Sequence, residues 1–230
     1  MAKKQKLKQK LSSLGGKLIT RDVPKSPISE SYRTLRTNID FSRVDEEIKT
    51  LVCTSSIPGE GKTTTIGNLA VTFAQQGKNV LLIDGDLRKP RLHTHFNLSN
   101  QVGLTSVLTK KIELEQAVLK ADVDNLWILP SGPIPPNPAE LLSSKSLKNL
   151  IEKAKNEFDL LLFDVPPVLS VTDAQILGHL TDGVILVVRA NGVKKEQLQK
   201  AKELLEKAHV TILGTILHGV KNQENYYYGE

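Results

Sequence analysis

The stretch Ser56–Thr64, which reads SIPGEGKTT, decides the fold of this 230-residue chain. It follows a short apolar run, Leu51–Thr54, which has the composition of a buried strand. It leads into a helical pattern over Lys62–Gln76, which ends at a glycine, a common helix stop. Strand, glycine-rich loop and helix in this order predict a P-loop, although Ser56 stands where that motif usually begins with glycine.

The residue types in this loop suit the binding of nucleotide phosphates. Gly59 and Gly61 allow backbone angles that turn N–H groups inward around phosphate oxygens. Lys62 can then reach the β- and γ-phosphates, and the Thr63 hydroxyl can ligate Mg²⁺. The N-terminus of the helix further stabilises the negatively charged phosphates. We therefore expect nucleotide phosphates to be bound by Pro58, Gly59, Glu60, Gly61, Lys62, Thr63 and Thr64.

Strand and helix signals alternate through the rest of the chain. Further apolar runs occur at Val80–Ile83, Trp127–Leu129, Leu160–Phe163, Val184–Val188 and Ile212–Leu217, with a helix expected over Lys194–Ala208. Continuous apolar strands separated by helices are typical of parallel sheets that are buried on both faces. The predicted fold is α/β, a P-loop NTPase with a mostly parallel central sheet and helices on both faces.

Three aspartates follow two of these strands directly. Asp84 and Asp86 come after Val80–Ile83, and Asp164 comes after Leu160–Phe163. Ligands of parallel α/β sheets bind at the carboxyl ends of the strands, so these carboxylates should meet the P-loop there. Carboxylates in that position can hold Mg²⁺, directly or through water, or accept a proton from an attacking hydroxyl.

The charge of the chain lies mainly at one end. The formal net charge is +6, but residues 1–25 carry eight basic side chains against one acidic one, so the rest is close to neutral. This distribution argues against a nucleic-acid partner on the folded body. One cysteine, Cys53, fits a reducing intracellular setting, and no apolar run is long enough to span a membrane.

Six motifs along the chain resemble those of bacterial tyrosine kinases. The P-loop, Leu82–Pro90 and Leu162–Pro167 resemble that family's Walker A, Walker A′ and Walker B motifs. Glu30–Arg36 matches its Glu-x-x-Arg-x-x-Arg motif, Ser131–Leu142 is another characteristic stretch, and Tyr226, Tyr227 and Tyr228 resemble its terminal tyrosine cluster. The likeness covers about residues 26–230 and is greatest to the stand-alone cytoplasmic kinases of Gram-positive capsule and exopolysaccharide systems.

The resemblance implies ATP-dependent autophosphorylation on tyrosine. It assigns catalysis to Lys62, Asp84 and Asp86, with Asp84 positioning or deprotonating the tyrosine hydroxyl. It assigns Mg²⁺ to Thr63, Asp86 and Asp164, and the phosphoacceptors are Tyr226, Tyr227 and Tyr228. Arg88 is expected near the phosphates, where it and Lys89 either bind them or serve an interface.

The resemblance also implies an assembly. It predicts a homo-oligomeric ring, an octamer, that feeds the tail of one subunit into the site of the next, with Glu30, Arg33 and Arg36 on the interface. Further partners are a membrane-spanning activator of the polysaccharide co-polymerase type and other tyrosine-containing protein substrates. The kinase would be cytoplasmic and recruited to the inner face of the membrane. The expected domains are a flexible basic arm (1–27), predicted from its lysines, glycines and prolines, the kinase domain (28–220) and the tyrosine tail (221–230).

Two other functions fit part of the pattern. A ParA/MinD-like ATPase switch has a similar layout, but it carries an extra lysine near the start of the P-loop, where this chain has Ile57. A nucleotide-binding scaffold that acts by assembly alone is the other alternative. His93 and His95 are interpreted as surface residues rather than metal ligands, and a contact of His218 with the base is left open.

Overall fold

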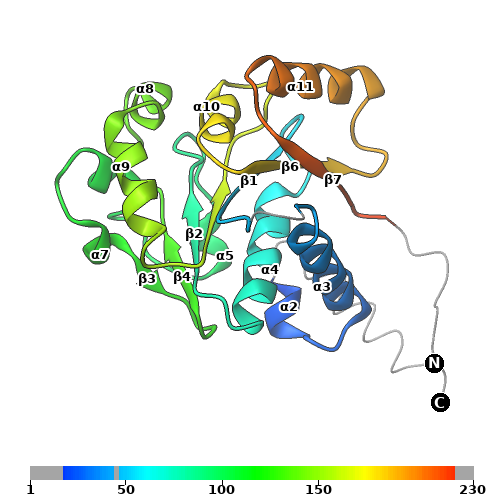
Figure 1. The fold of residues 1–230 in the computed structure, drawn as a ribbon, viewed down its shortest axis with the longest axis horizontal. Coiled ribbons are helices and arrows are strands. Elements are labelled where there is room, and N and C mark those ends of the chain that lie inside the picture. The colour runs from blue at the N-terminus through cyan, green and yellow to red at the C-terminus, as the bar shows by residue number, and fades with distance from the viewer. Residues whose placement is uncertain (1–17, 44–46, 221–230) are drawn as a thin grey trace.

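The computed structural model describes residues 18–43 and 47–220, which form one sheet between two layers of helices (Figure 1). The strands are β1 (Thr50–Ser55), β2 (Val80–Asp84), β3 (Leu119–Lys120), β4 (Leu126–Leu129), β5 (Leu160–Asp164), β6 (Gly183–Arg189) and β7 (Ile212–His218). The helices are α2 (Ile19–Asp22), α3 (Pro27–Asp40), α4 (Lys62–Gln75), α5 (Leu92–His95), α6 (Leu104–Leu108), α7 (Leu114–Ala117), α8 (Pro138–Leu142), α9 (Lys145–Ala154), α10 (Asp173–His179) and α11 (Lys195–Lys207).

The sheet has the strand order β3-β4-β2-β5-β1-β6-β7. All neighbouring strands are parallel except β3 and β4, so the predicted mostly parallel α/β fold is confirmed. The register places Asp84 beside Asp164, and Cys53 pairs with Asp164 from the other side. The order thus brings the carboxyl ends of β1, β2 and β5 together, where the sequence predicts the site.

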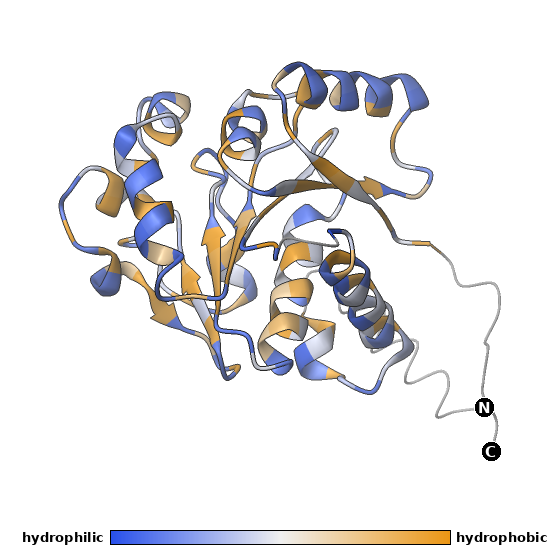
Figure 2. Cartoon of the chain, in the orientation of Figure 1, coloured by the Kyte–Doolittle hydropathy of each residue, from blue (hydrophilic) through white to orange (hydrophobic). Residues whose placement is uncertain are grey.

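The apolar core is divided by the sheet into two clusters. Leu51 and Cys53 face α4 and its neighbours, whereas Val52 faces the layer that contains α9, α10 and α11. Every residue of β1, β2 and β5 is buried, which explains why these runs are continuously apolar rather than alternating. Figure 2 shows the hydrophobic colouring concentrated in the strands and in α4, while α11 is mostly hydrophilic.

The sequence predicts a flexible arm over residues 1–27, but the structure shows that the folded body already includes residue 18. Leu18 is fully buried, and α2 packs on α4. The backbone N–H and the hydroxyl of Thr20 donate to Asn68 Oδ1 at 3.0 and 2.9 Å. Ser26 then caps α3 by accepting from the N–H of Ser29 at 3.1 Å. Residues 18–27 therefore belong to the folded body, because these apolar and hydroxyl groups have partners on α4 and α3.

The expected strands lie within one residue of their predicted bounds, while the short antiparallel strand β3 was not predicted. Leu119–Lys120 is too brief to show a pattern, and it pairs at the edge of the sheet with β4. In the described ranges, no helix is long and apolar enough to cross a membrane.

Candidate active site

The phosphate-binding loop has the backbone geometry that its glycines predict. Gly59 and Gly61 have φ of +87° and +94°, in the left-handed region, and Gly61 is the N-cap of α4. A Cβ on Gly59 would meet no atom within 4 Å, whereas a Cβ on Gly61 would lie 2.7 Å from the ring of His218. His218 is the last residue of β7, and its ring packs against Gly61 of this loop. The contact of His218 with the nucleotide base stays a prediction.

Glu60 has its carboxylate turned into the loop rather than toward a ligand. The side chain is 2% exposed, and Oε2 accepts from the N–H of Ile57 at 2.9 Å. Oε1 accepts from the N–H of Arg189 at 3.1 Å, which ties the loop to the end of β6. Of the loop residues expected to bind phosphate, Glu60 alone does not line the pocket described below, because its carboxylate serves these two amides.

A cluster of opposite charges forms where α4 begins. Lys62 Nζ lies 3.2 Å from Asp86 Oδ2 and 3.2 Å from Asp164 Oδ1. The Thr63 hydroxyl donates to Asp164 Oδ2 at 2.6 Å. Burial disfavours the ammonium, but the two carboxylates outweigh it and raise the pKa of Lys62 above its ordinary value. The pKa of Asp164 is also raised, because its complete burial exceeds the stabilisation by Lys62 and Thr63.

Asp84 belongs to this cluster but does not line the pocket. Its Oδ1 accepts from the N–H of Asp86 at 3.2 Å, and its Oδ2 accepts from the N–H of Leu92 at 3.0 Å. Burial and the neighbouring charge of Asp164 raise the pKa of Asp84 to about 8. The carboxyl therefore shapes the loop after β2 from behind, with both oxygens directed at backbone amides.

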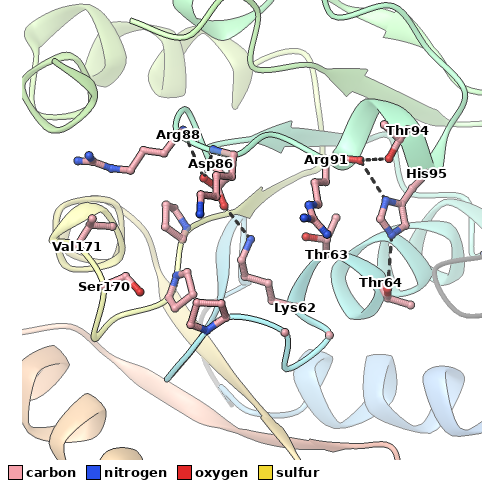
Figure 3. A pocket seen from close by; sticks show the side chains of 16 residues that line it. Lys62, Thr63, Thr64, Asp86, Arg88, Arg91, Thr94, His95, Ser170 and Val171 are labelled. Atoms are coloured by element: carbon pink, nitrogen blue, oxygen red, sulfur yellow. Dashed lines mark hydrogen bonds and ion pairs between the residues drawn. The ribbon is translucent and has the colours of Figure 1, made fainter. Parts of the chain in front are cut away.

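An open pocket of about 900 Å³ lies above the cluster (Figure 3). One wall comes from the phosphate-binding loop and the start of α4, and a second from the segment between β2 and α5. A third wall comes from the segment after β5, with Pro166, Pro167, Ser170 and Val171. The expected nucleotide-binding residues on the pocket surface are Pro58, Gly59, Gly61, Lys62, Thr63, Thr64 and Arg88, together with the expected metal ligand Asp86.

Arg88 is held by an acid that the sequence pattern did not reveal. Its Nε lies 3.0 Å from Asp173 Oδ2 and its Nη2 lies 3.1 Å from Asp173 Oδ1, an arrangement with two parallel hydrogen bonds. Asp173 is fully buried at the start of α10. An aspartate at the start of a helix is common, so the sequence around Asp173 gives no sign that this residue is the partner of Arg88.

The pocket also contains residues with no expected role. Arg91, Thr94 and His95 line it, and His95 Nε2 lies 3.5 Å from the Thr64 hydroxyl. Over the residues described, no group of three or more His, Cys, Asp or Glu side chains is arranged to hold a metal ion. Mg²⁺ needs no such group, since it keeps several waters and binds through one or two carboxylates plus substrate phosphates.

The charged residues of α3 are held within the chain itself. Glu30 Oε2 accepts from Arg33 Nη1 at 2.7 Å, and Arg33 Nη2 donates to the carbonyl of Pro24 at 2.6 Å. Arg36 Nη1 donates to the carbonyl of Thr72 on α4 at 3.0 Å. Arg36 is thus directed at the body of the protein, while Glu30 and Arg33 remain near the surface. The expected acceptors Tyr226, Tyr227 and Tyr228 lie outside the described residues.

The comparisons with known proteins agree with this geometry. Residues 48–212 match the model of the AAA domain family. The chain is 53% identical over 222 residues to tyrosine-protein kinase YwqD of Bacillus subtilis, covering 96% of this chain and 94% of the relative. The chain belongs to the bacterial tyrosine kinases. It is also 40% identical to the putative tyrosine-protein kinase CapB of Staphylococcus aureus, over 93% of this chain and 95% of that protein.

Solved structures of bacterial tyrosine kinases share the fold. The chimerical protein CapA2B2 is 42% identical with a TM-score of 0.84, covering 87% of this chain and 88% of the other. The kinase domain of Escherichia coli ETK is 34% identical with a TM-score of 0.86, over 93% and 84% of the two chains. The cell division ATPase MinD of Pyrococcus furiosus is more distant, at 28% identity and a TM-score of 0.63 over 74% and 73%.

Proposed function

We propose that this chain is an ATP-dependent protein-tyrosine kinase that phosphorylates Tyr226, Tyr227 and Tyr228 of a neighbouring subunit. The observation that carries the proposal is the cluster of Lys62, Asp86 and Asp164 at the base of the pocket. Phosphoryl transfer depends mainly on positioning and on neutralising charge, and this cluster can do both. The open pocket gives an acceptor side chain access to the same place.

The residues present fit Mg²⁺ and ATP. Two carboxylates and a hydroxyl, from Asp86, Asp164 and Thr63, form the oxygen donor set that Mg²⁺ prefers. The open space at Gly59 and the N-terminus of α4 fit a phosphate chain. Bound Mg²⁺ would neutralise charge on the β- and γ-phosphates. Lys62, released from part of its pairing with Asp86 and Asp164, would bind the same phosphates.

For Asp84 we propose a positioning role. Its two oxygens accept backbone N–H groups on both sides of the loop that carries Asp86 and Arg88. These two hydrogen bonds would fix the direction in which Asp86 faces the pocket. Asp84 would act in this way rather than by direct contact with the tyrosine hydroxyl. In Asp84→Asn the amide cannot accept at both positions, so the loop should loosen and tyrosine phosphorylation should fall.

The assembly follows from the same function. We propose that subunits form a ring, an octamer, in which Glu30 and Arg33 present charge to a neighbour and Arg36 supports their helix from below. The proposed activator is a membrane-spanning protein of the polysaccharide co-polymerase type, which recruits the kinase to the inner face of the membrane. Control of capsule or exopolysaccharide synthesis, through this tail and other tyrosine-containing proteins, is the proposed outcome.

Labelled ATP and mass spectrometry test the kinase directly. The full chain is incubated with ATP and Mg²⁺, with and without the cytoplasmic tail of the activator, and phosphate is mapped. We expect phosphate on Tyr226, Tyr227 or Tyr228, and none in Lys62→Met. ATP hydrolysis without phosphotyrosine in either condition would contradict the kinase and favour the ATPase switch.

Mixing two proteins, neither of which can phosphorylate its own tail, tests transfer between subunits. One partner carries Lys62→Met with an intact tail, and the other has an intact site with phenylalanine at positions 226, 227 and 228. Phosphate should appear on the tail of the first partner only in the mixture. A mixture as silent as each protein alone would show that transfer occurs within one subunit.

A further inference from the structure

The rim of the pocket opposite the phosphate-binding loop is basic. Arg88, Lys89 and Arg91 lie on the short segment between β2 and α5, and all three line the pocket. Figure 3 shows Arg91 directed toward the side of the pocket where Thr63 lies, and Arg88 directed away toward Val171. The segment is fixed in place because Asp86 Oδ1 accepts from the N–H of Lys89 at 3.0 Å.

Not all of this charge is available to a ligand. Arg88 is neutralised by the buried carboxylate of Asp173, and Lys62 faces the carboxylates of Asp86 and Asp164. Lys89 and Arg91 are exposed, and within the described part of the chain neither side chain has an ion-pair partner. The pocket is therefore lined by two positive charges without an ion-pair partner among the described residues, and both belong to exposed side chains.

The facing wall has a different character. Pro166, Pro167 and Val171 are apolar, and Ser170 is uncharged. A flat aromatic side chain can lie against such a wall while the residues next to it in sequence pass the basic rim. An acceptor that carries carboxylates beside its tyrosine would match both surfaces.

We propose that Lys89 and Arg91 select acceptor tyrosines that have acidic neighbours. The inference rests on the proposed kinase function and names the substrate class of that site. The tail of this chain has the matching sequence: Glu224 and Glu230 flank the three tyrosines, and residues 222–230 contain no lysine or arginine. Opposite charges on rim and tail strengthen the encounter and fix which segment enters, while the apolar wall accepts the ring.

The size of the preference follows from exposed ion pairs. Each solvent-exposed ion pair contributes little binding free energy, so two of them should raise kcat/KM for an acidic acceptor by about five-fold. The preference should shrink as salt is raised, because exposed charges are screened. The preference is a ratio between peptides measured with one enzyme at saturating ATP, so an effect of the substitutions on ATP binding cancels from it.

Peptide kinetics on the full chain test this inference. All enzymes carry phenylalanine at positions 226, 227 and 228, so that phosphotyrosine forms only on added peptide. Three peptides are compared: residues 222–230 as they stand, the same with Glu224→Gln and Glu230→Gln, and the same with lysine at both positions. The enzymes are the intact rim, Lys89→Gln/Arg91→Gln, and the matched surface control Lys195→Gln/Lys200→Gln on α11.

The intact rim and the α11 control should prefer the acidic over the glutamine peptide by about five-fold, and the rim variant should prefer neither. Charge reversal, Lys89→Glu/Arg91→Glu, should shift the preference to the lysine peptide. An unchanged ratio in the rim variants, or a rise in the KM for ATP with all peptides equally affected, would overturn the inference. No phosphotyrosine on any peptide from the intact rim would instead overturn the kinase function itself.

Discussion

The charges at the strand ends and the charges on α3 look alike in the sequence but are held very differently. Lys62, Asp86 and Asp164 are brought together from three separate segments and are nearly excluded from water. Glu30 and Arg33 are neighbours on one helix, and Glu30 remains 67% exposed. The same pairing of opposite charges therefore has large consequences in the first region and small ones in the second.

A charge pattern indicates chemistry where the fold, rather than the repeat of a single helix, brings the charges together. At the strand ends the polar groups leave water only because the fold forces them into one place, and each has a partner of opposite charge, a hydroxyl or backbone N–H groups. On α3 the pair needs no such explanation, since adjacent turns of any helix bring such residues together. The charge pattern of α3 therefore does not by itself indicate an interface, and measurements of the oligomer test that role.

The largest expected effect is that of Lys62→Met. The variant leaves the buried carboxylates of Asp86 and Asp164 without their cation, so the free energy of unfolding should fall by about 3 kcal/mol. Phosphotyrosine formation should also disappear. Chemical denaturation at pH 7 measures the first effect. The control is Lys202→Met, whose ion pair with Glu206 is largely exposed and should matter by less than about 1 kcal/mol. Equal losses in both variants would erase the contrast between the two regions.

The next effect separates two glycines of the phosphate-binding loop. Gly61→Ala should cost about 2 kcal/mol of stability, because it adds a clash with His218 to the strain of a positive φ. Gly59→Ala has similar backbone strain but open space, and should cost about 1 kcal/mol. Pairing Gly61→Ala with His218→Ala should recover part of the difference. If the two glycine variants unfold at the same denaturant concentration, the His218 contact has no energetic weight.

A smaller effect distinguishes two arginines on α3. Arg36→Ala loses a charged hydrogen bond to the carbonyl of Thr72 and should lower the free energy of unfolding by about 1.5 kcal/mol. Arg33→Ala breaks an exposed pair with Glu30 and an exposed hydrogen bond to the carbonyl of Pro24, and it should change the free energy of unfolding by less than about 1 kcal/mol. Light scattering on the same proteins tests assembly: Arg33→Ala should reduce the oligomer mass although its fold is intact, and an unchanged mass would remove Arg33 from the interface.

The smallest effect is a pH dependence at His218. Burial and the charge of Arg189 lower the pKa of this imidazole, so the unfolded chain binds its proton more readily than the folded one. Stability from the neutral ring is present above about pH 6.5 and is lost as the pH falls through the folded-state pKa. Denaturation at pH 7.5, 6.5 and 5.5 should show a shallower decline for His218→Asn. A parallel decline in both proteins would mean that the ring titrates as it does in water.

Much of the fold and of the cluster follows from the sequence. Runs such as Leu160–Phe163 are apolar throughout because both faces of the sheet are covered, and the aspartates mark where these runs end. Parallel strands bring such ends to one edge, so Lys62, Asp86 and Asp164 could be placed together without coordinates. The family resemblance is likewise confirmed by relatives that match nearly the whole chain.

The remaining features depend on contacts between distant segments that have no local pattern. Asp173 could not be linked to Arg88, nor His218 to Gly61, because neither partner is marked by spacing. Glu60 looked like a phosphate-loop residue, yet its carboxylate is used by Ile57 and Arg189. Thr20 was assigned to an arm because lysines, glycines and prolines mark residues 1–27, while its hydrogen-bond partner is Asn68, 48 residues further along.

The hydrogen bond between Thr63 and Asp164 joins residues 101 positions apart in the sequence, and this separation affects when the site can form during synthesis and folding. β1 takes its place beside β5, so the middle of the sheet cannot close until the chain has been made through Asp164. Contacts of such long range delay folding, because the chain between them must be ordered first. A growing chain thus carries the residues of the phosphate-binding loop long before it carries Asp164, and a fragment that ends before β5 lacks both that carboxylate and a strand that pairs with β1.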